Sequence, residues 1–229
     1  MLTLKDLLVV EDNQEIFDFK FESDDILMWL FIRISLYNTA ICKEYEIEIC
    51  RAVREELCFT DKILYFKNTI LNNPFDIIKA KYDILMFCSG ITNVKKGDKY
   101  FNRISEYFAS MYEDKTLLIE DSVRRKYYTP RSFPNVCYHD FIELEVDIKS
   151  KFVRPSEKDV ATIKILLKFL EQNFPYKLER SDLRRIEGIL LHISKRLNIY
   201  HCLYNKLFDK FNPKVIFLED GSYGTRSYI

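Results

Sequence analysis

Polar and ionisable residues that could take part in chemistry follow four short apolar runs of this 229-residue chain. The runs, each with the residues after it, are 82–88 with Ser89 and Gly90, 117–119 with Glu120, Asp121 and Ser122, 136–138 with His139 and Asp140, and 216–218 with Glu219, Asp220, Gly221 and Ser222. If the runs are parallel strands, these residues all fall at one edge of a sheet, which is the edge where open α/β folds bind ligands. The sequence therefore predicts a polar cleft there. Each residue alone also has a structural explanation, because turns and helix N-caps require the same residue types.

Basic and glycine-containing stretches near these strand ends could bind an anionic or sugar ligand. Arg124 opens the basic stretch 124–126, which could reach an anion at the sheet edge, although such clusters are commonly solvated surface. The stretch 221–224, Gly-Ser-Tyr-Gly, could bring backbone N–H groups close to a phosphate. It matches neither the dinucleotide-binding nor the P-loop pattern, however, and an ordinary turn is the better explanation. The tyrosines at 127 and 128 could stack on a sugar ring, pack in the core or lie on the surface.

The spacing of apolar residues predicts the elements that would position these groups. The strand candidates are the runs 82–88, 116–119 and 215–218 and the weaker run 135–138. Between the first two runs, Ile104, Phe108 and Met111 mark one face of a helix. Strand, helix and strand within about forty residues is the size of a right-handed βαβ unit. We therefore predict an α/β fold with a Rossmann-like, mostly parallel sheet that is covered by helices.

Three further elements are predicted nearer the amino terminus. Residues 17–21 alternate between apolar and polar, as in a strand, and Ser-Asp-Asp at 23–25 could cap a helix over 26–41. That helix is nearly all apolar, but it is shorter than the roughly 20 residues of a membrane span and carries Arg33 near its centre. We interpret it as a buried helix rather than a membrane segment. Thr60 could cap another helix.

The carboxyl-terminal third is predicted to be helical. A capping-box sequence at 155–159 begins one helix, Ser181 opens a second, and a third over 200–211 ends at Asn-Pro, 212–213. The apolar stripe expected to face the core from the second helix consists of Leu183, Ile186, Leu190, Ile193 and Leu197. No repeat or flexible linker interrupts the chain, so we predict a single domain over residues 1–229.

Composition excludes several classes of protein. A hydrophobic fraction of 48% excludes disorder, and 35 basic against 35 acidic residues leave no overall field that would attract nucleic acid. The six cysteines form no Cys-x-x-Cys pair, and Cys88 and Cys137 lie in apolar runs, as buried thiols do. His192 and His201 have no partner at metal-ligand spacing. We expect a reduced, cytoplasmic protein without a signal peptide, metal or cofactor.

Several stretches resemble the amino-terminal half of bacterial surface-polysaccharide glycosyltransferases. They are 82–90 (Tyr-Asp-Ile-Leu-Met-Phe-Cys-Ser-Gly), 98–102 (Asp-Lys-Tyr-Phe-Asn), 116–121 (Thr-Leu-Leu-Ile-Glu-Asp), 127–130 (Tyr-Tyr-Thr-Pro) and 213–224 (Pro-Lys-Val-Ile-Phe-Leu-Glu-Asp-Gly-Ser-Tyr-Gly). These enzymes have two Rossmann-like domains in the GT-B arrangement, the first for the acceptor and the second for a nucleotide-sugar donor. The resemblance implies an acceptor-binding half without its donor-binding half, so we expect the chain to be inactive alone.

The resemblance also implies roles for the residues at the predicted cleft. A carboxylate there would act as general base toward an acceptor hydroxyl. Asp220, with Glu219 beside it, is the first candidate, because it follows a buried strand where the two GT-B domains would face each other; Asp121 is the second. The residues expected to line the same cleft are Ser89, Ser122, Arg124 and Tyr223.

The same resemblance defines the expected partners. They are a sugar or lipid-linked saccharide acceptor, a separate donor-binding chain and, peripherally, a membrane surface, with no nucleic acid among them. The alternative function is a non-enzymatic binding or interaction module that derives from such an enzyme.

Overall fold

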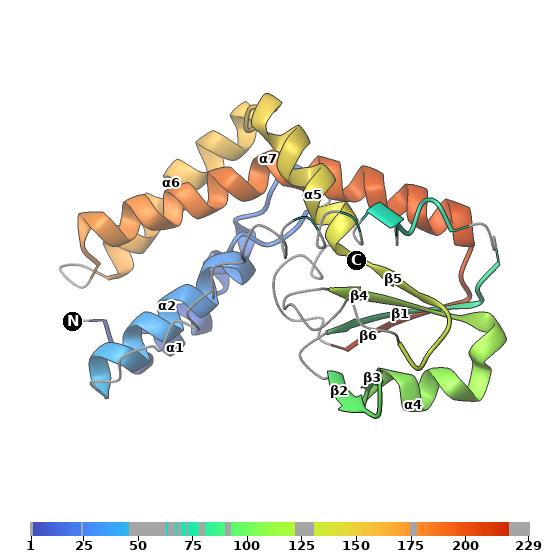
Figure 1. Cartoon of the computed structure of the whole chain (residues 1–229). Helices are drawn as coiled ribbons and strands as arrows, with labels where there is room; N and C mark the ends of the chain where they lie inside the picture. Colours follow the sequence, from blue (N-terminus) through green and yellow to red (C-terminus); the bar gives the residue numbers. More distant parts are fainter. Residues whose placement is uncertain are drawn as a thin grey trace. The chain divides into compact units, whose positions relative to one another are not determined.

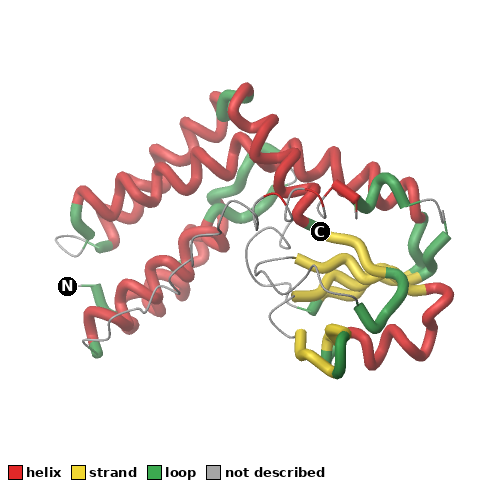
Figure 2. The backbone as a smooth tube through the Cα atoms, in the orientation of Figure 1, coloured by secondary structure: helices red, strands yellow, loops and turns green. Residues whose placement is uncertain are grey.

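The fold is taken from a computed structural model, which describes residues 2–23, 25–45, 63, 67, 70–71, 73–77, 81–89, 93–121, 131–174 and 178–219. The chain forms two compact units, a division that the single-domain prediction did not include. We call Met1–Arg54 with Ser150–Ile199 the helical unit, and Glu55–Lys149 with Tyr200–Ile229 the sheet unit. Figure 1 labels their elements, and Figure 2 separates helices from strands by colour.

The sheet unit contains the predicted parallel sheet. Its four strands run in the order β5 (Val136–Tyr138), β4 (Thr116–Asp121), β1 (Ile84–Ser89) and β6 (Val215–Leu218), and all three neighbouring pairs are parallel (Figure 1). This confirms the predicted fold class and the pairing of the three main apolar runs. The continuous apolar sequence of β1 and β4 has a physical reason, because central strands of a parallel sheet are covered on both faces.

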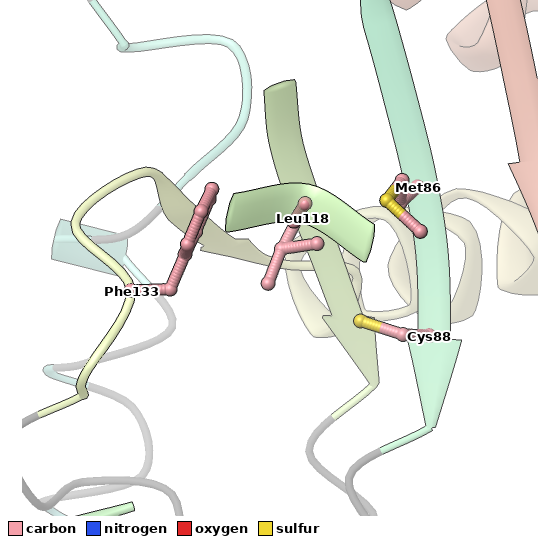
Figure 3. Close-up of a cluster of buried hydrophobic side chains, with 5 residues drawn as sticks. Met86, Cys88, Leu118 and Phe133 are labelled. Carbon is pink, nitrogen blue, oxygen red and sulfur yellow. The ribbon is translucent and has the colours of Figure 1, made fainter. Parts of the chain in front are cut away.

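Side chains of β1 alternate between two separate apolar layers, as the period of a strand requires. Met86 and Cys88 point to one side, where they form a buried cluster with Leu118 and Phe133 (Figure 3) and with Ala109. On the other side, the ring of Phe87 packs edge-on against Tyr204, which belongs to a helix. Helices therefore contribute to both faces of the sheet.

The helices on these two faces come from different parts of the sequence. On the Met86 side, a hairpin of β2 (Asn93–Lys96) and β3 (Lys99–Asn102) turns at Gly97, whose φ of 62° suits glycine. It leads into α4 (Ser105–Ala109) and the 3-10 helix η3 (Ser110–Lys115). On the Phe87 side lie residues of α7 (Arg180–Phe211), while α5 (Asp140–Lys149) follows β5.

The orientation of α4 is opposite to the one predicted. Ile104, Phe108 and Met111 were expected to face the core, but they are 39%, 53% and 59% exposed. The buried residues of α4 are instead Ser105, Glu106 and Ala109. The predicted face does not belong to one helix, because Ile104 precedes α4 and Met111 lies in η3. Polar contacts of Glu106 decide which side of α4 is buried.

Helix α7 is one continuous helix of 32 residues, where the sequence analysis predicted two. The apolar stripe continues from Leu197 to Tyr200 and Leu203 at steps of three, and no Gly or Pro lies between Leu197 and Leu203. The predicted core stripe is confirmed at Ile186 and Leu190, which are both fully buried. The helix ends as predicted before Pro213, with Asn212 in the left-handed conformation at φ 43°. Residues 180–199 of α7 belong to the helical unit and 200–211 to the sheet unit.

The helical unit otherwise consists of α1 (Leu4–Asp12), η1 (Gln14–Asp18), α2 (Trp29–Glu44), η5 (Ser150–Phe152) and α6 (Glu157–Asn173). The predicted N-cap of α6 is confirmed, because the Ser156 hydroxyl accepts a hydrogen bond from the Asp159 backbone. Helix α2 buries the stripe Trp29, Ile32, Leu36 and Ala40, in agreement with its interpretation as a core helix. Among the described residues, no helix is both long and apolar enough to cross a membrane.

Two local predictions near the amino terminus are wrong. Residues 14–18 wind into η1 behind an Asn13 cap, so only Lys20 of the predicted strand 17–21 forms a β-bridge, with Leu27. Backbone hydrogen bonds from Phe21 to Ile26 and from Met28 to Phe19 close a loop after Lys20. Helix α2 begins only after this loop, at Trp29, so residues 23–25 do not cap it. The proposed helix cap at Thr60 lies outside the described residues.

Candidate functional site

The carboxyl ends of the parallel strands gather most of the strand-end residues that the sequence singled out. In the register of β1 and β4, Ser89 lies opposite Asp121, so their backbones are neighbours. The backbone N–H of Glu219 donates to the Phe87 carbonyl at 3.0 Å, and that of His139 donates to the Glu120 carbonyl at 2.8 Å. Strand ends from β1, β4, β5 and β6 therefore form one edge, which we call the carboxyl edge.

Several predicted site residues cannot be placed at this edge. Asp220, Ser122, Arg124 and Tyr223 lie outside the described residues, and so do the side chains of Ser89 and Asp121. Glu219 is the one candidate from the predicted list whose side chain the structure describes. The roles assigned to the other six residues stay predictions.

Glu219 is half-buried at the end of β6 and contacts a residue of α4. The hydroxyl of Ser105, which is fully buried, donates to Oε2 of Glu219 at 3.3 Å. The buried thiol of Cys88 lies close by, and its pKa is raised well above the usual value by burial, then by the charges of Glu120 and Glu219. The thiol thus stays protonated. Glu219 is a partly accessible carboxylate close to the buried apolar cluster that contains Cys88.

A second carboxylate at this edge, Glu120, is fully buried and paired. Its Oε2 accepts from Nη1 of Arg131, and its Oε1 accepts from Nδ2 of Asn93 at 2.8 Å. Burial raises the pKa of the Glu120 carboxyl, whereas the positive charge of Arg131 and the hydrogen bond from Asn93 oppose that rise. No solvent reaches Glu120, so it can position its neighbours but is not placed to touch a ligand.

Arg131 also bridges to a third carboxylate, Glu106 of α4. Nη2 of Arg131 and Oε1 of Glu106 are 2.7 Å apart, and their side chains are only 8% and 2% exposed. Glu106 accepts further hydrogen bonds from the Asn102 backbone at 3.1 Å and from the Ser132 hydroxyl. We call Glu106, Glu120 and Arg131 the ion triad. Arg131 is the central member of the ion triad, because removing it would leave two buried carboxylates without a cation.

The ion triad was not predicted from the sequence. Glu106 was missed because the apolar spacing of α4 suggested that its side would face solvent. Arg131 was missed because it follows the strand-end motif at 120–122 by nine residues and resembles an ordinary surface arginine. The sequence signal that could have found Arg131 is the large apolar residue two positions after it, Phe133, which lies in the core. Among the described residues, Nε of Arg131 and Oδ1 of Asn93 are buried without a hydrogen-bond partner.

His139 takes part in a separate buried cluster on the Phe87 side of the sheet. Its Nε2 lies 2.6 Å from the Tyr204 hydroxyl, and its Nδ1 lies 3.5 Å from Oε1 of Glu143. The hydroxyl of Tyr200 donates to the other oxygen of Glu143 at 2.5 Å. His139 and Tyr204 are 4% and 2% exposed, so this cluster joins α5 and α7 within the core.

A hollow of about 480 Å³ lies at the opposite, amino-terminal edge of the sheet. Its lining residues are Lys81, Asp83, Lys210, Phe211, Asn212, Pro213 and Lys214. Two of its lysines are already engaged, because Lys214 pairs with Asp83 at 3.3 Å and Lys210 donates to the Phe75 carbonyl. We therefore regard the carboxyl edge, and not this hollow, as the candidate site.

The described residues of the carboxyl edge can accept and donate hydrogen bonds but have no metal-ligand arrangement. No group of three or more His, Cys, Asp or Glu residues within the described ranges could hold a metal ion. Comparisons with protein-family models, curated proteins and solved structures find no match to this chain. The fold alone defines the sheet unit as an α/β, Rossmann-like unit with a polar carboxyl edge.

Proposed function

We propose that the sheet unit binds a hydroxyl-rich ligand, a sugar or lipid-linked saccharide, at its carboxyl edge, as the acceptor-binding part of a glycosyltransferase. The observation that carries the proposal is the position of Glu219. It is a half-buried carboxylate at the end of a parallel strand, within 3.3 Å of the Ser105 hydroxyl. Ligands bind at this edge of open α/β sheets, and carboxylates bind sugar hydroxyls as hydrogen-bond acceptors.

The chemistry of the proposed site divides its carboxylates by role. Glu219, or Asp220 next to it, would take the proton of an acceptor hydroxyl, because a general base must come within hydrogen-bond reach of that proton. Glu120 is fully buried and paired with Arg131, so it would act as a positioning residue. The ion triad supports this role by fixing α4, which carries Ser105 and Glu106 next to each other.

The alternative proposal is a binding module without catalysis. It is favoured by the fact that Arg131 pairs with both Glu120 and Glu106, which removes these two carboxylates from any direct part in a reaction. The two proposals share the ligand class and differ in whether a sugar is transferred.

Ligand binding is tested first, by saturation-transfer NMR of the full chain with glucose, galactose and N-acetylglucosamine. We expect a signal from at least one sugar that Glu219→Gln weakens severalfold, because a charge-assisted hydrogen bond is about twice as strong as a neutral one. Glu113→Gln is the matched control, since Glu113 is exposed on η3, which precedes the amino end of β4 and so lies away from the carboxyl edge. Sugar signals that are absent, or equal in both variants, would refute binding at Glu219.

Catalysis is tested separately with UDP-glucose and UDP-N-acetylglucosamine. We expect the chain alone to leave these donors intact, and transfer to require a donor-binding partner. In such a reconstituted pair, Asp220→Asn should remove most of the transfer if Asp220 is the base. Transfer by the isolated chain would contradict the acceptor-half proposal. Sugar binding without transfer under any condition would favour the binding module.

A further inference from the structure

Helix α4 and η3 expose a stripe of large apolar side chains. Its members are Ile104, Tyr107, Phe108, Met111 and Tyr112, which are 39%, 61%, 53%, 59% and 59% exposed. Ile104, Tyr107 and Phe108 are exposed at α4, whose buried residues are Ser105, Glu106 and Ala109, and Tyr107 and Phe108 are in edge-to-face contact. Met111 and Tyr112 continue the exposed apolar surface into η3. A contiguous apolar surface of this kind on a polar-rimmed protein typically marks an interaction site. We call it the aromatic stripe.

The ion triad holds this stripe on the outside. Glu106, on the opposite side of α4, is bound to Arg131, to the Asn102 backbone and to Ser132. Turning the helix to bury Phe108 would break all three contacts and deprive the buried Arg131 of one of its two carboxylate partners. The outward direction of the stripe is therefore fixed by buried polar contacts, and is not a result of weak packing.

Basic residues adjoin the stripe at its amino-terminal end. The β2–β3 hairpin runs directly into α4, and the two lie side by side (Figure 1). Its exposed charged residues and those of the following turn are Lys95, Lys96, Lys99 and Arg103, with Asp98 as the one acidic residue between 93 and 104. At the far end of the stripe, Lys115 stands beside Glu113 and Asp114. Positive charge is therefore concentrated on the hairpin side.

We propose that the aromatic stripe and the basic hairpin together dock the sheet unit on an anionic lipid bilayer. Tyr and Phe side chains favour the boundary between headgroups and acyl chains, and lysines near the surface are attracted to anionic headgroups. A second copy of the chain fits less well. A stripe of five side chains is far short of the about 20–30 residues on each side of a stable protein interface. The proposal rests on this surface alone and not on the sugar-binding proposal.

The test is co-sedimentation of the full chain with vesicles of phosphatidylcholine, with and without phosphatidylglycerol. We expect binding that requires phosphatidylglycerol and weakens as salt is added. Phe108→Ser should lower the partition coefficient roughly fivefold to tenfold, from the apolar area that the bilayer no longer covers. Phe152→Ser is the matched control, since Phe152 is 86% exposed in the helical unit, and it should leave binding unchanged.

The electrostatic part is tested by exchanging lysines for glutamine. Replacing Lys95, Lys96 and Lys99 together should weaken binding by about fivefold for each lysine. The same exchange at Lys158, Lys164 and Lys168, which are exposed on α6, is the control and should have little effect. Equal thermal melts of all variants establish that the fold is intact.

Three results would overturn the proposal. The first is equal binding to vesicles with and without phosphatidylglycerol, or no binding to either. The second is an equal effect of Phe108→Ser and Phe152→Ser. The third is a lipid-free dimer, detected by analytical ultracentrifugation, that Phe108→Ser dissociates, because the stripe would then be an interface between copies.

Discussion

Replacing Arg131 with methionine should destabilise the sheet unit strongly. Methionine keeps part of the side-chain volume but removes the charge that pairs with Glu106 and Glu120. These carboxylates are 2% and 0% exposed, so both would be left buried without a cation. Removing one partner of a buried ion pair costs about 3–5 kcal/mol of the free energy of unfolding. Because domains have only about 5–15 kcal/mol in total, Arg131→Met should lose about a fifth or more of the stability.

The effect should depend on pH in a defined direction. Burial already raises the pKa of Glu120, and Arg131 opposes that rise, so the substitution should raise this pKa further. An acid whose folded-state pKa is raised lowers the free energy of unfolding progressively as the pH rises from its unfolded-state pKa to its folded-state pKa, because the unfolded state ionises first, and the loss is complete above the folded-state pKa. The stability lost in Arg131→Met should therefore be largest at neutral pH, and should shrink as the pH falls and the Glu120 carboxyl is protonated.

Urea titrations with a reporter in the sheet unit measure this effect. The thiols of Cys88 and Cys137 are fully buried, so their alkylation, followed by mass spectrometry, reports opening of that unit. Arg103→Met is the matched control, because Arg103 is exposed just before α4 and should change stability little. A labelling midpoint for Arg131→Met equal to that of Arg103→Met would refute the importance of the ion triad.

A compensated variant separates lost charge from lost packing. Exchanging Glu106 and Glu120 for glutamine in the Arg131→Met background removes all three charges together. Neutral replacement of a buried ionic group is often tolerated, so this variant should recover a large part of the lost stability. If it is no more stable than Arg131→Met alone, the destabilisation comes from lost packing, and the electrostatic explanation is wrong.

Two further predictions concern the core. Leu190→Ala on α7 should cost about 2–5 kcal/mol, because Leu190 is fully buried, whereas Ile165→Ala at a 61% exposed site of α6 should cost far less; thermal and urea melts of both variants would show it. Burial raises the pKa of the thiols of Cys88 and Cys137, so both should react with iodoacetamide much more slowly than the exposed Cys202 in the folded protein, and at a similar rate in denaturant. A fast reaction of Cys88 in the native protein would contradict the packing around β1.

Much of the sheet could be predicted because its signals are local. The runs that became β1, β4 and β6 are continuous and apolar, and each ends at small or ionisable residues. Strands covered on both faces have this appearance in a parallel sheet, and this explanation holds for β1 and β4. β6 is instead an edge strand, in which Val215, Ile216 and Phe217 are 52%, 40% and 39% exposed, so the expectation that Asp220 follows a buried strand is wrong. The position of Glu219 at the carboxyl edge followed from the same rule.

The failures came from features that sequence spacing does not contain. Residues 17–21 alternate between apolar and polar as a strand does, but the Asn13 cap stabilises a 3-10 helix over 14–18 instead of strand pairing. The predicted break in α7 near residue 198 was wrong because Leu197 and Tyr200 are three residues apart and continue the buried stripe. For α4, the apolar spacing grouped Ile104, Phe108 and Met111 together but did not predict that all three would be exposed to solvent.

The direction of α4 depends on contacts between residues that are distant in the sequence. Arg131 lies 25 residues after Glu106 and 11 after Glu120, and no local pattern links the three. Once paired, they fix Glu106 in the interior and thereby orient its neighbours along the helix. Ser105 is directed to Glu219 at the carboxyl edge, and Tyr107 and Phe108 are directed to the surface. One buried ionic group thus determines the surroundings of the candidate site and the face of the helix that is free to meet a partner.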